Sequence, residues 1–309
     1  MKKIVSLLFL IIIIAGCKGY KTDKQAEEAY AESDSTWIAD TVYNDGLRYC
    51  YGTVWTGDRL LISNFGGDTF DPLDVSGKGY IMQLKDGKLS PYLNADELNS
   101  PKGMAVMDNL LFVADVNCIL VFDMNNLNSK PQVIPFAPGE VFVSDLAVVN
   151  NWIYASVRDA SLVYRGQIVD KANIAATDME VYTVEVSGPN GIDIYNDSIF
   201  IASYPLNDSI GMRNSIYLDM NINTLNPQLY KLENLPGYYC GVAYDGKNKT
   251  LYYTDNIDGQ LRSENMLNGN NKLLFPEKIM LSPQMLTVAD GKLYVPDADV
   301  SRLYVFTVK

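Results

Sequence analysis

One unit of sequence recurs six times between residue 50 and the end of the chain, and it limits the possible folds more than any other feature. Each unit begins with a short strand-like run at or near a glycine, passes through a polar turn, and closes a second run with a small residue before Asp or Asn. The units begin at residues 52, 103, 145, 191, 241 and 285. This spacing of 42 to 51 residues is typical of β-propeller blades, each of which contains four antiparallel strands.

The turns within the units support this interpretation. Gly57-Asp58, Asn150-Asn151 and Asp245-Gly246 are residue pairs that tolerate the positive φ of tight hairpins. A third apolar run follows in every unit, and a fourth follows in most, as at 132–134 and 228–230. The last unit stops at its third run, so we expect the segment 37–42 to add the missing strand and cover the open edge.

The sequence therefore predicts an all-β, six-bladed β-propeller that is closed by an N-terminal strand and spans residues 36–309. A solenoid of β-units is the alternative architecture.

The first residues have the pattern of a targeting signal. Lys2 and Lys3 precede an apolar run from Ile4 to Ala15, as in a secretory signal peptide. The run is shorter than the roughly 20 residues that span a bilayer. An uncleaved membrane anchor is the alternative.

The tetrad Ile14-Ala15-Gly16-Cys17 resembles the lipobox of bacterial lipoproteins. That resemblance implies cleavage before Cys17 and acylation of this cysteine, so that residues 1–16 form a lipoprotein signal peptide. Residues 17–35 are polar and without apolar period, and they predict a flexible tether. We expect a membrane-anchored protein of the cell envelope, periplasmic or surface-exposed, whose contact with the membrane is the lipid on Cys17.

The composition excludes several classes of function. The chain has no histidine, which removes Ser-His-Asp triads, Cys-His pairs and His-ligated zinc. With 37 acidic and 25 basic residues, its formal charge of −12 argues against a nucleic-acid partner. Cys50, Cys118 and Cys240 remain after Cys17, and an odd number cannot be fully paired within one chain. Their state is left open, although Cys118 is expected to be a small buried hydrophobe.

Hairpin geometry predicts a site at one end of the channel. The residue before the first strand of a blade and the residue that ends its second strand lie at the same end of the hairpin. The face so defined pairs Tyr51 with Asn64, Lys102 with Asp115, Ser144 with Val157, Asn190 with Ser203, Cys240 with Asp255, and Gln284 with Asp297. From these we expect a ligand site at the channel mouth. Its candidate residues are Tyr51, Asn64, Lys102, Asp115, Asn190, Cys240, Asp255 and Asp297.

Two alternatives apply to this site. The terminal Asp and Asn side chains can cap turn amides, and Lys102 can form an ion pair with Asp115. Two long connections, 65–79 and 204–214, follow second strands. The first contains two phenylalanines and three aspartates and is interpreted as a lid or rim over the channel, with a solvated acidic loop as its alternative.

Several short motifs resemble known propellers. They are Pro-Lys-Gly-Met-Ala-Val at 101–106, Pro-Asn-Gly-Ile-Asp-Ile at 189–194, and Asp-Gly-Lys-Asn-Lys-Thr-Leu-Tyr-Tyr-Thr-Asp at 245–255. They resemble NHL-type propellers and the senescence-marker/gluconolactonase and strictosidine-synthase-like superfamily. Resemblance to the gluconolactonases implies a divalent cation, usually Ca²⁺, held by one Glu, two Asn and one Asp. Asn190 matches one Asn of that set, whereas Tyr51, Cys240 and the pair Val143-Ser144 stand at the other positions.

Two functions remain. The first, which we prefer, is a lipid-anchored propeller that binds a small molecule, glycan or protein at its channel mouth without turnover. The alternative is a divergent metal-dependent lactone or ester hydrolase, with Asn190 as a metal ligand and Asp115, Asp255 or Asp297 supplying the carboxylates. A nucleophilic role for Cys240 lacks a histidine to activate it. No catalytic residue is assigned.

Overall fold

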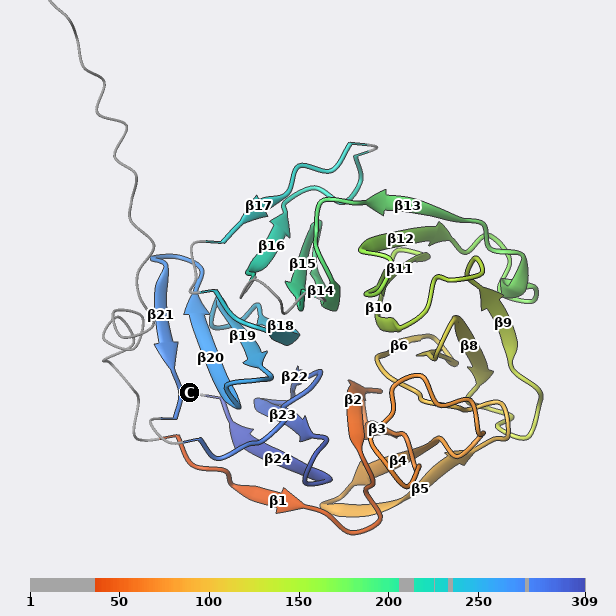
Figure 1. Ribbon diagram of the computed structural model, residues 1–309, viewed down its shortest axis with the longest axis horizontal. Coiled ribbons are helices and arrows are strands. Elements are labelled where there is room, and N and C mark those ends of the chain that lie inside the picture. Colours follow the sequence, from red (N-terminus) through yellow and green to blue (C-terminus); the bar gives the residue numbers. More distant parts are fainter. Residues whose placement is uncertain (1–36, 206–213, 225, 233–235, 276–277, 309) are drawn as a thin grey trace, which may run out of the picture. The chain divides into compact units, whose positions relative to one another are not determined.

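Every strand of the computed structural model belongs to one of six four-stranded antiparallel sheets. The structure describes residues 37–205, 214–224, 226–232, 236–275 and 278–308. The sheets surround a common axis as the blades of a propeller (Figure 1). The predicted signal peptide, the tether and Cys17 lie outside the described residues. In the part of the chain that is described, no helix is long and apolar enough to cross a membrane.

Each blade uses four strands, from the axis outward. Blade 1 consists of β2 (Cys50–Trp55), β3 (Leu60–Asn64), β4 (Tyr80–Lys85) and β5 (Lys88–Asn94). Blade 2 consists of β6 (Met104–Met107), β7 (Leu110–Ala114), β8 (Cys118–Asp123) and β9 (Gln132–Pro135). Blade 3 consists of β10 (Val143–Val149), β11 (Trp152–Val157), β12 (Leu162–Gln167) and β13 (Met179–Thr183), with the 3-10 turn η1 (Ile174–Ala176) before β13.

The other three blades repeat the plan. Blade 4 consists of β14 (Pro189–Tyr195), β15 (Ser198–Ser203), β16 (Ile216–Asp219) and β17 (Tyr230–Lys231). Blade 5 consists of β18 (Tyr239–Asp245), β19 (Thr250–Asp255), β20 (Gln260–Asn265) and β21 (Asn270–Leu273). Blade 6 consists of β22 (Thr287–Ala289), β23 (Lys292–Asp297), β24 (Arg302–Thr307) and, as its outermost strand, β1 (Thr41–Tyr43).

The N-terminal strand closes the ring as predicted, but it begins later than expected. β1 covers Thr41–Tyr43 rather than the whole of 37–42, and Val42 pairs with Tyr304 of β24. Trp37 is instead buried, with its ring 6.0 Å from that of Tyr252 and 6.3 Å from that of Phe306. The tryptophan therefore packs into the core, and strand pairing starts only after it.

The hydrophobic core is divided into layers between neighbouring blades. Leu61 of blade 1 and Leu111 of blade 2 share one layer, and Ile153 of blade 3 and Phe112 of blade 2 share the next. The same arrangement continues around the described ring and ends where Leu60 of blade 1 meets Leu303 of blade 6. Since both faces of most blades are covered, the inner strands read as continuous apolar runs rather than as strictly alternating ones.

The hairpin turns at the far end of the innermost strands adopt the positive φ that their residues predict. Asn150 and Asn151 have φ of 48° and 63°. In blade 5, however, the left-handed residue is Lys249, with φ of 54°, and not the predicted pair Asp245-Gly246. Asp245 ends β18 and accepts the amide hydrogens of Lys247 and Asn248, which moves the turn two residues along the chain.

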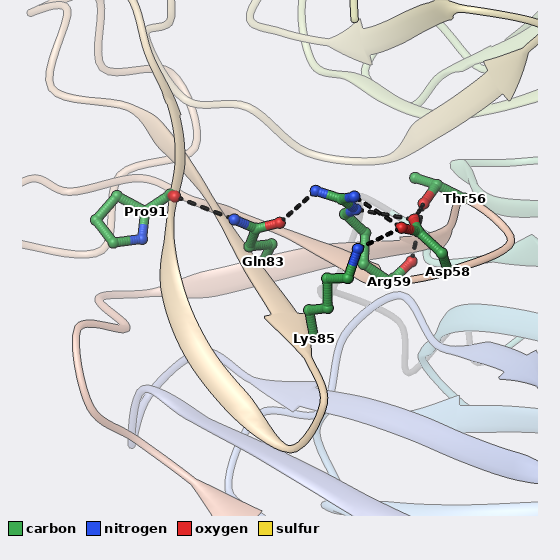
Figure 2. A network of polar contacts seen from close by, with 6 residues as sticks. All are labelled: Thr56, Asp58, Arg59, Gln83, Lys85 and Pro91. Atoms are coloured by element: carbon green, nitrogen blue, oxygen red, sulfur yellow. Dashed lines mark hydrogen bonds and ion pairs between the residues drawn. The ribbon is translucent and has the colours of Figure 1, made fainter.

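In blade 1 the corresponding turn is fixed by charged side chains (Figure 2). Asp58 forms ion pairs with Arg59, at 2.7 Å, and with Lys85, at 2.6 Å. Arg59 also donates to Gln83 Oε1, which ties the turn to the outer hairpin of the blade. These two cations hold the pKa of Asp58 well below its usual range.

The glycine that begins four of the six units is required by the neighbouring blade. A Cβ on Gly52 would lie 2.2 Å from the carbonyl oxygen of Lys102, and a Cβ on Gly103 would lie 1.9 Å from Oδ1 of Asp145. Both distances are far below van der Waals contact. The repeated glycine therefore marks the place where consecutive innermost strands touch.

Hydroxyl groups connect the blades at the same level. Ser63 Oγ accepts the amide of Gly52 at 2.8 Å and donates to the carbonyl of Lys102, in the next blade, at 2.7 Å. Thr254 Oγ1 makes the equivalent pair of bonds between blades 5 and 6. These are the small residues that precede the terminal Asp or Asn of the sequence unit.

We predict that Ser63→Ala lowers the free energy of unfolding by about 1–3 kcal/mol, because it leaves a buried amide and a buried carbonyl without their partner. The exposed Ser76 bonds only the nearby Asp74, so Ser76→Ala is the control and should cost less than about 0.5 kcal/mol. The midpoints of urea unfolding, compared at an unchanged m-value, measure both changes in stability. Equal midpoints for the two variants would contradict the connecting role.

Candidate functional site

In four blades, the residue before the start of the repeated unit is turned toward the axis by an irregularity in its strand. In four blades the register between the innermost strand and its neighbour shifts at this point. The shifted segments contain Tyr51-Gly52, Ser144-Asp145, Asn190-Gly191 and Cys240-Gly241. A bulge removes a residue from the ladder and redirects its side chain. Tyr51, Asn190 and Cys240, three of the predicted site residues, therefore meet at the centre of the ring with Ser144.

These side chains bond to one another. Ser144 Oγ donates to Asn190 Oδ1, and Asn190 Nδ2 donates to Cys240 Sγ at 3.2 Å. Cys240 Sγ donates in turn to Gln284 Oε1 at 2.9 Å, and the Tyr51 hydroxyl lies 3.8 Å from the same sulfur. All five side chains are at most 2% exposed. Their hydrogen-bonding capacity is directed at each other across the axis.

Lys102 and two aromatic rings complete the centre. The Lys102 ammonium is fully buried, lies 5.0 Å from the ring centre of Phe142 and 5.7 Å from that of Phe65, and donates to the Ser100 carbonyl at 2.9 Å. Phe65 stacks on Tyr51 with a ring separation of 5.2 Å. We call the central group the axial plug; its members are Tyr51, Phe65, Lys102, Phe142, Ser144, Asn190, Cys240, Gln284 and Met285.

Burial controls the charge state of the plug. Desolvation raises the pKa of the Cys240 thiol to about 12 and raises the pKa of Tyr51 well above its usual value. Both groups are therefore neutral at physiological pH. Desolvation also lowers the pKa of Lys102 to about 8, against the opposing effect of the Asp115 carboxylate. At neutral pH the plug therefore holds one buried positive charge, that of Lys102, which desolvation makes less stable.

The carboxylates at the ends of the second strands accept hydrogen bonds from loop amides. Asp115 accepts the backbone N–H groups of Asn99, Ser100 and Val116. Asp297 accepts those of Leu281 and Ser282. Lys102 and Asp115 lie at the same end of their blade, but the lysine donates to a carbonyl and the carboxylate accepts from amides.

The two remaining terminal residues behave similarly. Asp255 accepts from the amide of Tyr238 at 3.3 Å and pairs with Arg262 at 3.4 Å. Asn64 accepts from the amide of Arg48 and donates to the carbonyl of Ile62. Both are completely buried. The predicted site residues are thus brought to one end of the ring, where the strand-ending ones hold loops in place.

The donors at the plug do not fit a calcium ion. Ca²⁺ requires six or more oxygen ligands, most of them carboxylates or carbonyls. Tyr51 and Cys240 offer a neutral phenol and a neutral thiol, and the side-chain oxygen of Asn190 accepts the Ser144 hydroxyl. In the described ranges, no group of three or more Cys, Asp or Glu side chains is arranged to hold a metal ion.

A second set of side chains lies above the plug, on the same face. Phe70 stacks on Phe65 at 5.3 Å and lies 5.9 Å from the ring of Tyr49. The guanidinium of Arg158 lies 3.6 Å from the ring centre of Phe142 and 5.4 Å from that of Tyr204. We call Tyr49, Phe70, Arg158 and Tyr204 the aromatic rim. The loop at 65–79 thus contributes one aromatic residue to the plug and one to the rim.

Phe142 and Arg158 are absent from the sequence-based candidates. Arg158 follows directly on Val157, the last residue of β11, and it stands next to the blade-end position that the sequence analysis considered. A positively charged side chain next to a blade-end position was the sequence feature that could have identified Arg158 as a candidate. Phe142 precedes β10 with a φ of 62°, a conformation that nothing in the local sequence indicates.

Comparison with known proteins shows the fold alone. No protein-family model matches the sequence, and no curated protein sequence matches it. Solved structures do match. A structural-genomics protein of unknown function from Bacteroides thetaiotaomicron has a TM-score of 0.64 and 12% identity, over 91% of this chain and 74% of that one. Virginiamycin B lyase from Staphylococcus aureus has a TM-score of 0.56 and 15% identity, over 87% and 99%.

A structure of the nidogen/laminin complex matches with a TM-score of 0.57 and 14% identity, over 76% of this chain and 92% of that one. The neighbours are of propeller type. At such low identity the shared property is the architecture, and the activities of these proteins do not transfer.

We predict that the stability of the propeller rises with pH because of Lys102. In the unfolded chain the lysine holds its proton up to its usual pKa of 10.5, but in the folded protein it loses the proton near pH 8. The unfolded state therefore binds more protons between these values, and the free energy of unfolding increases across that window.

Comparison with Lys102→Met isolates this contribution. The stability of the wild-type protein relative to Lys102→Met should increase by about 2 kcal/mol between pH 7.5 and 9.5, measured by urea unfolding. Lys88→Met, at an exposed position outside the plug, is the control for the substitution itself. A pH-independent difference for Lys102→Met would show that the lysine does not titrate in this range.

Proposed function

We propose that the protein is a lipid-anchored β-propeller of the cell envelope that binds a small molecule, glycan or protein at its channel mouth without turnover. The observation that carries the proposal is the division between plug and rim. The plug closes the channel with buried side chains whose polar groups bond to each other. The rim above it presents aromatic faces and a guanidinium, and Phe70 is 37% exposed.

The rim suits a ligand that carries an anionic group beside a flat or apolar portion. The Arg158 guanidinium lies against the rings of Phe142 and Tyr204, which restrict its movement, and its Nε pairs with Asp159 at 3.1 Å. A planar guanidinium held in this way binds carboxylates or phosphates through parallel N–H donors. Aromatic faces beside it bind sugar rings or other apolar surfaces. The open face is therefore better suited to recognition than to chemistry.

The chemistry of the buried groups supports binding without turnover. A general base or nucleophile acts best when its pKa lies near the working pH. The Cys240 thiol has a pKa of about 12, and Asp115, Asp255 and Asp297 are buried against loop amides or an arginine. Lys102 has a suitable pKa, but its ammonium is enclosed by the plug.

The alternative is the gluconolactonase-like hydrolase that the motifs suggest. It requires a divalent cation at Asn190, and the surrounding phenol, thiol and hydroxyl do not supply the oxygen ligands of Ca²⁺. No contact among the described residues favours this alternative, and we prefer the binding function.

The binding proposal predicts a ligand whose affinity depends on the side chains of the aromatic rim. A panel of sugar acids, lactones, oligosaccharides and peptides is screened by thermal shift, since a ligand of the native state must raise its stability. Arg158→Ala and Phe70→Ala should each weaken a confirmed ligand about tenfold or more. Tyr230→Ala, on the outermost strand of blade 4, should leave binding unchanged.

The same experiment tests turnover. Each confirmed ligand is incubated with the protein, with and without added calcium, and examined by mass spectrometry. Conversion of the ligand would show that the protein is an enzyme. A confirmed ligand that binds the two rim variants as tightly as the wild type would place the site elsewhere.

The lipid anchor makes a separate prediction. If Cys17 is acylated, the protein should fractionate with membranes and partition into detergent, and Cys17→Ser should move it to the soluble fraction. Cys118→Ser, within blade 2, is the matched control and should stay with the membranes. Membrane fractionation of the Cys17→Ser protein identical to that of the wild type would exclude lipidation as the means of attachment.

A further inference from the structure

The channel on the other side of the plug contains a cavity. Its volume is about 320 Å³, at the small end of the range for ligand pockets. Met285 belongs both to the plug and to the cavity wall, so the plug forms one end of the cavity. The wall continues along all six innermost strands to Trp55, Val106, Val148, Ile194, Tyr244 and Val288. The cavity therefore extends toward the hairpin turns, away from the rim.

Two carboxylates line this cavity, Asp145 of β10 and Asp193 of β14. Among the described residues of the wall they are the charged ones, and the others are apolar, aromatic or hydroxylated. Burial raises the pKa of Asp145 to about 7, with a smaller contribution from the charge of Asp193. Burial likewise raises the pKa of Asp193 to about 6. Near neutral pH the cavity thus holds negative charge, and the described residues of its wall include no cation.

Backbone amides fix both carboxylates. Asp145 accepts the N–H of Leu146 at 2.9 Å and that of Ile192, in the next blade, at 2.9 Å. Asp193 accepts the N–H of Ile194 at 2.9 Å and that of Tyr244, also in the next blade, at 2.6 Å. Each ionised carboxylate has about four acceptor positions, so each retains capacity for a further donor. The two groups are held rigidly, which lowers the entropy lost on binding.

Nearby cations do not neutralise these carboxylates. Arg59 and Lys85, at the far end of blade 1, pair with Asp58 (Figure 2). Lys102 lies in the plug and donates to Ser100. The other titratable groups at the cavity are the Tyr244 phenol in its wall and the Cys240 thiol of the plug; the pKa of each is raised by burial, so both are neutral.

We propose that this cavity binds a small organic cation, a protonated amine with a short apolar body. The ammonium would bond to Asp145 and Asp193, and the apolar body would contact the valine, isoleucine and tryptophan side chains of the wall. An ammonium supplies three N–H donors to carboxylates that retain acceptor capacity, and its charge offsets the repulsion between them. Aromatic rings in the wall add attraction for a cation. The site is independent of the ligand proposed for the rim.

The test uses n-butylammonium chloride and n-butanol as a matched pair, with binding to the purified protein followed by isothermal titration calorimetry. We expect saturable binding of n-butylammonium and none of n-butanol at the same concentrations. Because the carboxylates must ionise, affinity should rise about tenfold or more between pH 5.5 and 8, with protons released on binding below pH 7. Equal binding of the two probes, or binding that does not vary with pH, would overturn the proposal.

Variants locate the site. Asp145→Asn and Asp193→Asn should each weaken n-butylammonium at least tenfold. Asp290→Asn is the control: Asp290 lies in the hairpin turn between β22 and β23, outside the cavity wall, and its φ of 51° is one that Asn tolerates. It should bind as the wild type does.

A fallback variant and a second probe complete the test. If Asp145→Asn fails to fold, Asp193→Asn and the wild-type pH profile decide alone, and unchanged affinity in Asp193→Asn would refute the site. Calcium chloride is the second probe. Saturable calcium binding that excludes n-butylammonium would show that the carboxylates serve an inorganic ion and would overturn the assignment to an organic cation.

Discussion

The contact between consecutive innermost strands at the axis is the constraint on which the rest of this propeller depends. The strands approach so closely that a side chain on Gly52 or Gly103 would overlap the next blade. The same contact is bridged by hydroxyls such as Ser63 and Thr254. Each blade on its own is a small sheet with exposed apolar faces, and only this approach buries them between neighbours.

The close approach also decides what the central side chains do. In four blades a bulge at the start of the innermost strand directs one side chain toward the axis, where it meets those of the other blades. There Asn190, Cys240 and Gln284 bond to one another rather than to solvent. A buried polar group without a partner costs more than a bonded one gains, so a closed network is the stable outcome for these residues. Convergence at the axis thus produces closure of the channel.

The sequence predicts the architecture well because the repeated glycine and the small residue before Asp or Asn report directly on contacts between blades. It locates the strands and the closing segment, although burial of Trp37 delays that strand to Thr41. It also predicts which side chains gather at one end of the ring. It does not reveal whether a convergent polar group is free, since that depends on its partners. The sequence around Asp115 would look the same whether its carboxylate bound a ligand or, as here, accepted hydrogen bonds from three loop amides.

The plug separates two electrostatic environments along one axis. Lys102 and Arg158 place positive charge beside aromatic rings at the rim end, whereas Asp145 and Asp193 line the cavity below. The protein carries a formal charge of −12, which favours the approach of cations to its surface in general. An anion that reaches the rim must therefore be held by local groups, and a cation that enters the cavity is attracted by the whole field. Selectivity at the two ends consequently rests on different physical terms, short-range geometry at the rim and long-range attraction at the cavity.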